Sequence, residues 1–228
     1  MTIKAVLFDL DGTLLDREAS LLTFLSDQYE RFSVFHAIEK DLFIQRFITL
    51  DDNGYVWKDK VYQQMIHDFS IKHIDWSLLL NDYIDNFQKY CIGFPNLLST
   101  LMQLKKHRMK LALVSNGWGQ FQFNNLKGLQ IEHLFDEILI SDWVGLRKPD
   151  PAIFIRALSK LKSSPEQAIF VGDHPINDIR ASQAVGMQAI WKRSPHVATV
   201  TNVEADAIID DLEEIIPFVL SNRTVHGR

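Results

Sequence analysis

The chain alternates short apolar runs with segments of helical periodicity. Apolar runs without alternation are typical of strands that are buried on both faces of a parallel sheet. The predicted strands are Ile3–Phe8, Lys110–Val114, Glu137–Ile140, Ala168–Val171 and Gln188–Trp191, with Ala207–Ile209 as a candidate sixth. The predicted helices among them are Leu97–Lys106, Phe121–Leu126, Pro151–Lys160, Ile176–Val185 and Leu212–Leu220. Strands that alternate with helices predict an α/β fold with a parallel sheet.

One long segment lacks this alternation. All seven prolines lie at or beyond position 95, and Gly54 is the single glycine between residues 17 and 92. Large apolar residues recur there at helical spacing, as in Leu21, Leu25 and Phe32. We therefore expect an inserted subdomain of about four helices over residues 17–92, while residues 1–16 and 93–228 form the α/β core.

The net charge, the apolar stretches and the cysteine count exclude several classes of protein. The chain of 228 residues has a formal net charge of −5, whereas proteins that track nucleic-acid backbones carry a basic excess. The apolar part of its N-terminus is short and interrupted by acids, and no apolar stretch reaches the roughly 20 residues of a membrane span. A lone cysteine, Cys91, suits a reducing compartment. We expect a soluble cytoplasmic protein that binds neither nucleic acid nor membrane.

The first predicted strand ends in a pair of acids, Asp9 and Asp11, followed by Gly12 and Thr13. Positions two apart on a strand point to the same side, so both carboxylates can reach one pocket. Neighbouring carboxylates repel each other, which calls for a cation or a shared chemical task. The alternative is a polar turn closed by Gly12 and Thr13.

Polar residues also follow the second and third predicted strands. Ser115, Asn116 and Gly117 follow the second, where a hydroxyl and backbone N–H groups can cradle an anion. Lys148 follows the third, in a loop that two prolines stiffen. Read alone, the sequence around Ser115 favours a loop or helix-capping serine, and Lys148 alone is more typical of a solvated surface lysine.

The fourth predicted strand is followed by Asp173 and Asp178, with His174 beside them. In parallel sheets, ligands bind at the carboxyl ends of strands, so both acids can face the pocket of Asp9 and Asp11. Several converging oxygen ligands suit Mg²⁺ better than zinc. Asp178 can instead cap the following helix, and His174, which lacks a partner at metal-ligand spacing, is interpreted as a loop residue.

Together these segments resemble the haloacid dehalogenase-like hydrolase superfamily, in the order Asp-x-Asp-Gly-Thr, Ser-Asn, Lys-Pro and Gly-Asp-x-x-x-x-Asp. The resemblance spans Ile3 to about Leu220. It implies a Rossmann-like sheet with helices on both faces and a helical cap inserted after the first motif. That cap is expected to close over the site, exclude water and set specificity.

The resemblance also implies a role for each motif residue. Asp9 is the expected nucleophile, Asp11 the general acid and base, and Lys148 steadies the phosphoryl group and Asp9. Thr13, Ser115 and Asn116 are expected to bind the phosphate ester. Mg²⁺ is the expected cofactor, and its expected ligands are Asp9, the main-chain carbonyl of Asp11, Asp173, and Asp178 directly or through water.

The predicted function is a Mg²⁺-dependent phosphatase that hydrolyses a small phosphorylated metabolite, such as a nucleotide or a sugar phosphate, through an aspartyl-phosphate. A phosphomutase of the same fold is the alternative, and a 2-haloacid dehalogenase or an inactive binding protein fits less well. Haloacid dehalogenases lack an aspartate two positions after the nucleophile, whereas Asp11 is present here. In the helical segment, Asp51–Lys58 is interpreted as a connection between helices rather than a substrate-facing loop, and Arg46 and Lys58 as solvated charges rather than anion ligands.

Overall fold

The computed structural model describes residues 2–193 and 203–221, and the chain divides into two compact units. One unit comprises Met1–Arg17 and Ile92–Arg228, and the other comprises Glu18–Cys91. These boundaries lie one residue from those expected from the sequence.

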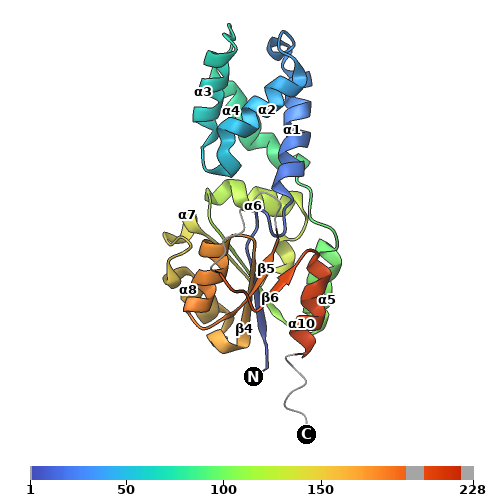
Figure 1. Cartoon of the computed structure of the whole chain (residues 1–228), viewed down its shortest axis with the longest axis vertical. Coiled ribbons are helices and arrows are strands. Elements are labelled where there is room, and N and C mark those ends of the chain that lie inside the picture. Colours follow the sequence, from blue (N-terminus) through green and yellow to red (C-terminus); the bar gives the residue numbers. More distant parts are fainter. Residues whose placement is uncertain (1, 194–202, 222–228) are drawn as a thin grey trace. The chain divides into compact units, whose positions relative to one another are not determined.

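The first unit contains a six-stranded sheet whose neighbouring strands are all parallel (Figure 1). The spatial order is β3 (Glu137–Ile140), β2 (Lys110–Ser115), β1 (Ala5–Phe8), β4 (Ala168–Gly172), β5 (Gln188–Lys192) and β6 (Ala207–Ile209). The predicted α/β class is confirmed, and Ala207–Ile209 is a strand. The strand order reverses between β1 and β4, and such a switch point is where ligands bind in open α/β sheets.

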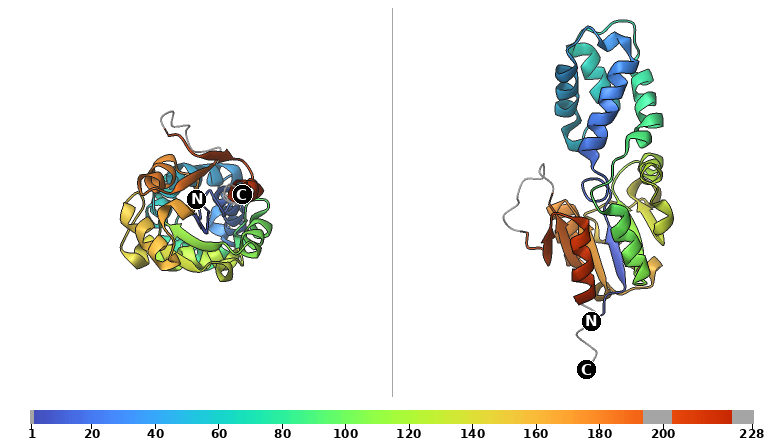
Figure 2. Two further views of the ribbon diagram at one scale, coloured as in Figure 1. Left: turned by 90° about the horizontal axis from the view of Figure 1, so that it is seen from below. Right: turned by 90° about the vertical axis from the view of Figure 1, so that its right-hand side faces the viewer.

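Helices cover both faces of this sheet (Figure 2). They are α5 (Leu97–Lys106), α6 (Gly119–Gly128), α7 (Ser141–Val144), α8 (Pro151–Leu161), α9 (Ala181–Ala184) and α10 (Ile215–Ser221). The continuous helix predicted over residues 176–185 is instead a π-helical turn, Pro175–Arg180, followed by α9, because the amide of Ile179 bonds the carbonyl of His174. Likewise, a 3₁₀ turn, Leu212–Glu214, precedes α10.

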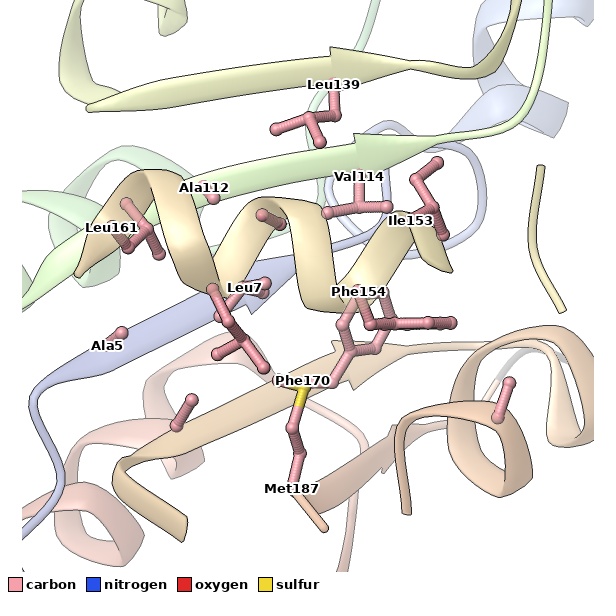
Figure 3. Packing of buried hydrophobic residues seen from close by; sticks show 14 residues of the cluster. Ala5, Leu7, Ala112, Val114, Leu139, Ile153, Phe154, Leu161, Phe170 and Met187 are labelled. Carbon is pink, nitrogen blue, oxygen red and sulfur yellow. The ribbon is translucent and has the colours of Figure 1, made fainter. Parts of the chain in front are cut away.

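Helix α8 shows how the sequence builds one face of the core. Asp150 caps it by accepting a hydrogen bond from the amide of Ala152 at 2.9 Å, and Pro151 supplies the fixed backbone angle of a first helical residue. Figure 3 shows Phe154 of α8 against Phe170 of β4, with ring centroids 5.1 Å apart. Leu7 of β1 belongs to the same buried cluster, so α8 packs against both β1 and β4.

The second unit contains four long helices, in agreement with the expected helical segment. They are α1, which begins at the boundary (Arg17–Arg31), α2 (Lys40–Asp51), α3 (Lys58–Asp68) and α4 (Trp76–Asn86). Buried aromatic rings join them, as where Phe24 and Tyr83 meet edge to face at 5.2 Å. Within residues 2–193 and 203–221, no helix combines the length and apolar character that crossing a membrane requires.

The connection between α2 and α3 places two charges in the interior. Lys58 forms an ion pair with Asp51, and the two side chains are 3% and 2% exposed. The ammonium also lies 5.6 Å from the ring centre of Tyr83. The segment is a connection between helices, as expected, but the expectation that Lys58 is a solvated charge is wrong because it is buried against Asp51. Arg46 instead pairs with Asp68 at the surface of the unit.

We expect Lys58→Met to lower the free energy of unfolding by about 3–5 kcal/mol, because it leaves the carboxylate of Asp51 buried without its main counter-charge. Lys60→Met is the matched control, since that side chain is 70% exposed. Its expected effect is within about 0.5 kcal/mol. Equilibrium urea unfolding measures both, and equal losses in the two variants would contradict a stabilising role for the buried pair.

Candidate active site

Three carboxylates converge at the carboxyl ends of β1 and β4. Asp9 follows β1, Asp173 follows β4, and Asp178 lies in the π-helical turn after it. One oxygen from each lies within 4.8 Å of the others. The structure thus brings together the side chains of three of the four predicted metal-binding residues.

Lys148 lies among these acids. Its Nζ is 2.6 Å from Oδ1 of Asp9 and 2.7 Å from Oδ1 of Asp178, and the residue is 3% exposed. Asn116 holds its backbone in place: the amide of Lys148 donates to Oδ1 of Asn116, and Nδ2 of Asn116 donates to the carbonyl of Lys148, both at 2.9 Å. The Asn116 side chain therefore positions Lys148, and its expected contact with substrate stays a prediction.

Two glycines let the chain close tightly around the acids. Gly12 adopts φ +77°, and a Cβ there would lie 2.2 Å from Oδ2 of Asp173. A Cβ on Gly172 would lie 2.4 Å from the Cβ of Asp178. Any side chain at either position would displace a carboxylate, so the compact cluster depends on glycine at both.

Two hydroxyl groups lie near the carboxyl ends of the neighbouring strands: Thr13 after β1, and Ser115 as the last residue of β2. Oγ1 of Thr13 is buried and has no hydrogen-bond partner among the described residues. Ser115 is also buried, and its Oγ makes one long hydrogen bond, of 3.4 Å, to the adjacent carbonyl. A buried hydroxyl without a partner is costly, so Thr13 is suited to donate to a ligand oxygen.

Asp11 is placed differently from the other acids. Its Oδ2 accepts a hydrogen bond of 2.6 Å from Nε2 of Gln122 on α6, and its carboxylate is not part of the three-acid cluster. Gln122 was not among the residues predicted from the sequence. The available signal was weak: Gln122 and Asn125 are three residues apart, on the helix face that the neighbouring Phe121 and Leu126 predict to be buried.

In the turn after β4, the side chain that caps the backbone amides is His174 rather than Asp178. Nδ1 of His174 accepts hydrogen bonds from the amides of Ile176 and Asn177, at 3.1 and 3.0 Å. Asp178 instead accepts from the amide of His174 at 3.0 Å through Oδ2. His174 therefore caps the turn, which leaves Oδ1 of Asp178 to face Lys148.

The three clustered carboxylates can carry more negative charge than the single ammonium of Lys148 neutralises, and the pKa values of these groups are shifted. Burial, opposed by Lys148 and reinforced by Asp178, raises the pKa of Asp9 to about 7. Burial and the carboxylate of Asp9 raise the pKa of Asp173 well above its usual range. Burial alone would lower the pKa of Lys148, but Asp178 and Asp9 raise it above its ordinary value, so Lys148 stays protonated.

The donor set fits a hard divalent cation. All three clustered groups are carboxylates, and the described residues place no histidine or cysteine in the cluster. Mg²⁺ binds through one or two carboxylates with water or substrate oxygens completing its shell, whereas zinc prefers nitrogen and sulfur ligands. A divalent cation would also offset the excess negative charge.

Known proteins with similar sequences and folds include both phosphatases and dehalogenases. The sequence profile of the haloacid dehalogenase-like hydrolases matches residues 6–192. The chain is 30% identical over 208 residues to a glyceraldehyde 3-phosphate phosphatase of Methanopyrus kandleri, covering 82% of this chain and 83% of the relative.

Two solved structures resemble this chain in both sequence and fold. A phosphatase from Thermococcus onnurineus is 28% identical, with a TM-score of 0.68, and the match covers 97% of this chain and 100% of the other. A 2-haloacid dehalogenase from Pseudomonas syringae is 27% identical, with a TM-score of 0.62 and coverage of 96% and 99%.

Proposed function

The chain belongs to the haloacid dehalogenase-like hydrolases, and on this basis we propose that it is a Mg²⁺-dependent phosphatase that hydrolyses a small phosphorylated metabolite through an aspartyl-phosphate. The observation that carries the proposal is the placement of Lys148 between Asp9 and Asp178, with the carboxylate of Asp11 held apart from them. In this arrangement the proposed nucleophile, Asp9, is separate from the proposed proton-transfer group, Asp11.

In the first step, a carboxylate oxygen of Asp9 attacks phosphorus, and the bond between phosphorus and the ester oxygen breaks. Asp11 gives its proton to the departing alkoxide. In the second step, water attacks phosphorus, the bond between phosphorus and Asp9 breaks, and Asp11 takes the proton from the water. The two steps restore both carboxyl groups and release an alcohol and inorganic phosphate.

The remaining residues hold the phosphoryl group and the metal. Lys148 neutralises charge on the phosphoryl oxygens, and Thr13 and Ser115 donate hydrogen bonds to them. Asp9, the main-chain carbonyl of Asp11 and Asp173 would hold Mg²⁺, with Asp178 direct or through water. When bound, the cation offsets the repulsion between an anionic nucleophile and a phosphate dianion.

Asp11 argues against a dehalogenase. Displacement of a halide needs no proton for the leaving group, whereas an alkoxide leaving group does, and Asp11 is an acid in a position to supply it. The dehalogenase from Pseudomonas syringae shares the fold, so Asp11 is a better guide to the reaction than the structural likeness. We further propose that the helical unit, residues 18–91, supplies substrate selectivity.

The assay is a panel of phosphate esters with Mg²⁺, including glyceraldehyde 3-phosphate, nucleotides and sugar phosphates. Release of free phosphate is expected, and Asp9→Asn is the control. An isomerised sugar phosphate formed with a bisphosphate primer would support the phosphomutase instead. Release of chloride from a 2-haloacid would support the dehalogenase.

We expect Asp173→Asn to raise the Mg²⁺ concentration needed for half-maximal activity by about tenfold or more, because it removes one anionic ligand. Calorimetric titration of the protein with Mg²⁺ should show the same weakening without substrate. Asp85→Asn, at an exposed site of the helical unit, is the control. Equal Mg²⁺ affinity in both variants would exclude Asp173 as a ligand.

A further inference from the structure

We propose that Gln122 is a positioning residue that fixes the carboxylate of Asp11 in the orientation that proton transfer requires. This inference rests on the proposed role of Asp11 as the acid and base. The motif series does not include Gln122, and its assignment follows from the contacts that its side-chain amide makes.

Those contacts determine which way the amide points. Nδ2 of Asn125 donates to Oε1 of Gln122 at 3.2 Å. Nε2 of Gln122 donates to Oδ2 of Asp11 at 2.6 Å and lies 3.2 Å from the carbonyl of Asn116. Because both neighbours on the Nε2 side are acceptors and the neighbour on the Oε1 side is a donor, the flipped amide would lose these hydrogen bonds.

The surroundings leave the amide little freedom. Gln122 is 5% exposed and Asn125 is 1% exposed, so neither side chain can exchange its partner readily for water. Gly117, after Ser115 and Asn116, is part of the same arrangement: a Cβ at Gly117 would lie 2.8 Å from Nε2 of Gln122. The glycine of this turn therefore gives the amide the space it needs to reach Asp11.

Among the described residues, Gln122 is the hydrogen-bond donor to the carboxylate of Asp11. Asp11 is partly exposed, and its backbone pairs with Leu15 in an isolated bridge beside a turn. That pairing leaves the side chain free to rotate, because the final torsion of an aspartate side chain is broad. A hydrogen bond to Oδ2 fixes that torsion and leaves Oδ1 available to exchange a proton. Because proton transfer requires heavy atoms within about 2.6–3.2 Å, a freely rotating carboxylate would spend much of its time out of reach.

The test compares two variants of Gln122 with matched variants of Gln120, an exposed residue of the same helix. Gln122→Met removes the donor, and Gln122→Glu keeps an acceptor for Asn125 but replaces the donor to Asp11 with an oxygen. Gln120→Met and Gln120→Glu make the same chemical changes at the surface. Thermal unfolding of all four reports any loss of the fold separately from kinetics.

The decisive readout is how kcat/KM with Mg²⁺ depends on the leaving group. For an alkyl phosphate, whose alkoxide needs a proton, both Gln122 variants should lower kcat/KM by about 10- to 100-fold. For an aryl phosphate with a weakly basic leaving group, the loss should be about threefold or less, because departure needs no acid. A merely structural role would lower both equally, and that result would overturn the proposal.

A double-mutant cycle tests whether Gln122 acts through Asp11. In an Asp11→Asn background, Gln122→Met should have almost no further effect, whereas independent contributions would multiply. Multiplying effects, or wild-type kinetics in both Gln122 variants, would refute the positioning role. Failure of the proposed function has a different signature: no Mg²⁺-dependent phosphate release by the wild type, or activity that survives Asp9→Asn.

Discussion

Asp9→Asn is expected to lower kcat for phosphate-ester hydrolysis by at least about 10⁴-fold, because an amide cannot form the covalent intermediate. The substitution is nearly isosteric, and Lys148 keeps its contact with Asp178. It also removes one carboxylate from a cluster with excess negative charge. The thermal midpoint should therefore stay close to that of the wild type, or rise.

Steady-state kinetics across the substrate panel measures this loss. The unfolding midpoint is measured on the same preparation, because it separates a loss of the nucleophile from a loss of the fold. Full activity in a folded Asp9→Asn variant would exclude Asp9 as the nucleophile.

Lys148→Met is expected to lower kcat/KM by about 10²- to 10³-fold, the effect of removing one charged donor from a transition-state site. It should also lower the free energy of unfolding by about 3–5 kcal/mol in metal-free buffer, because Asp9 and Asp178 lose a buried counter-charge. Saturating Mg²⁺ should reduce the stability loss, since a cation that binds the same carboxylates offsets their repulsion.

Arg147→Met is the matched control for this variant, because Arg147 precedes Lys148 and is exposed. Its effects on kinetics and on urea unfolding should be small. If Arg147→Met and Lys148→Met lower kcat/KM equally, the loss reflects damage to the loop rather than the missing ammonium.

The parts of the site that the sequence could predict are those that follow strands. Buried strands leave a strong apolar signal, and a parallel sheet brings their carboxyl ends to one edge, so Asp9 and Asp173 could be expected near each other. The breaks in the two predicted helices were harder to foresee. They depend on individual hydrogen bonds, such as the one from the amide of Ile179 to the carbonyl of His174, which apolar periodicity does not report.

The residues that the sequence could not place are polar groups buried inside helical packing. Gln122 meets Asp11 across 111 positions of the chain, and no local pattern encodes that contact. Lys58 likewise looked like an ordinary surface lysine, although it is buried with Asp51. In both cases tertiary packing overrides the local preference of a polar residue for solvent.

The central claim is that the phosphoryl group passes through Asp9. Rapid acid quenching during turnover of a radiolabelled phosphate ester, followed by peptide mapping, tests it most directly. We predict a label that is sensitive to hydroxylamine, as an acyl phosphate should be, on the peptide that contains Asp9, and no label in Asp9→Asn. Label on a different residue, or phosphate release by the wild type with no labelled enzyme under conditions that trap it, would contradict the account.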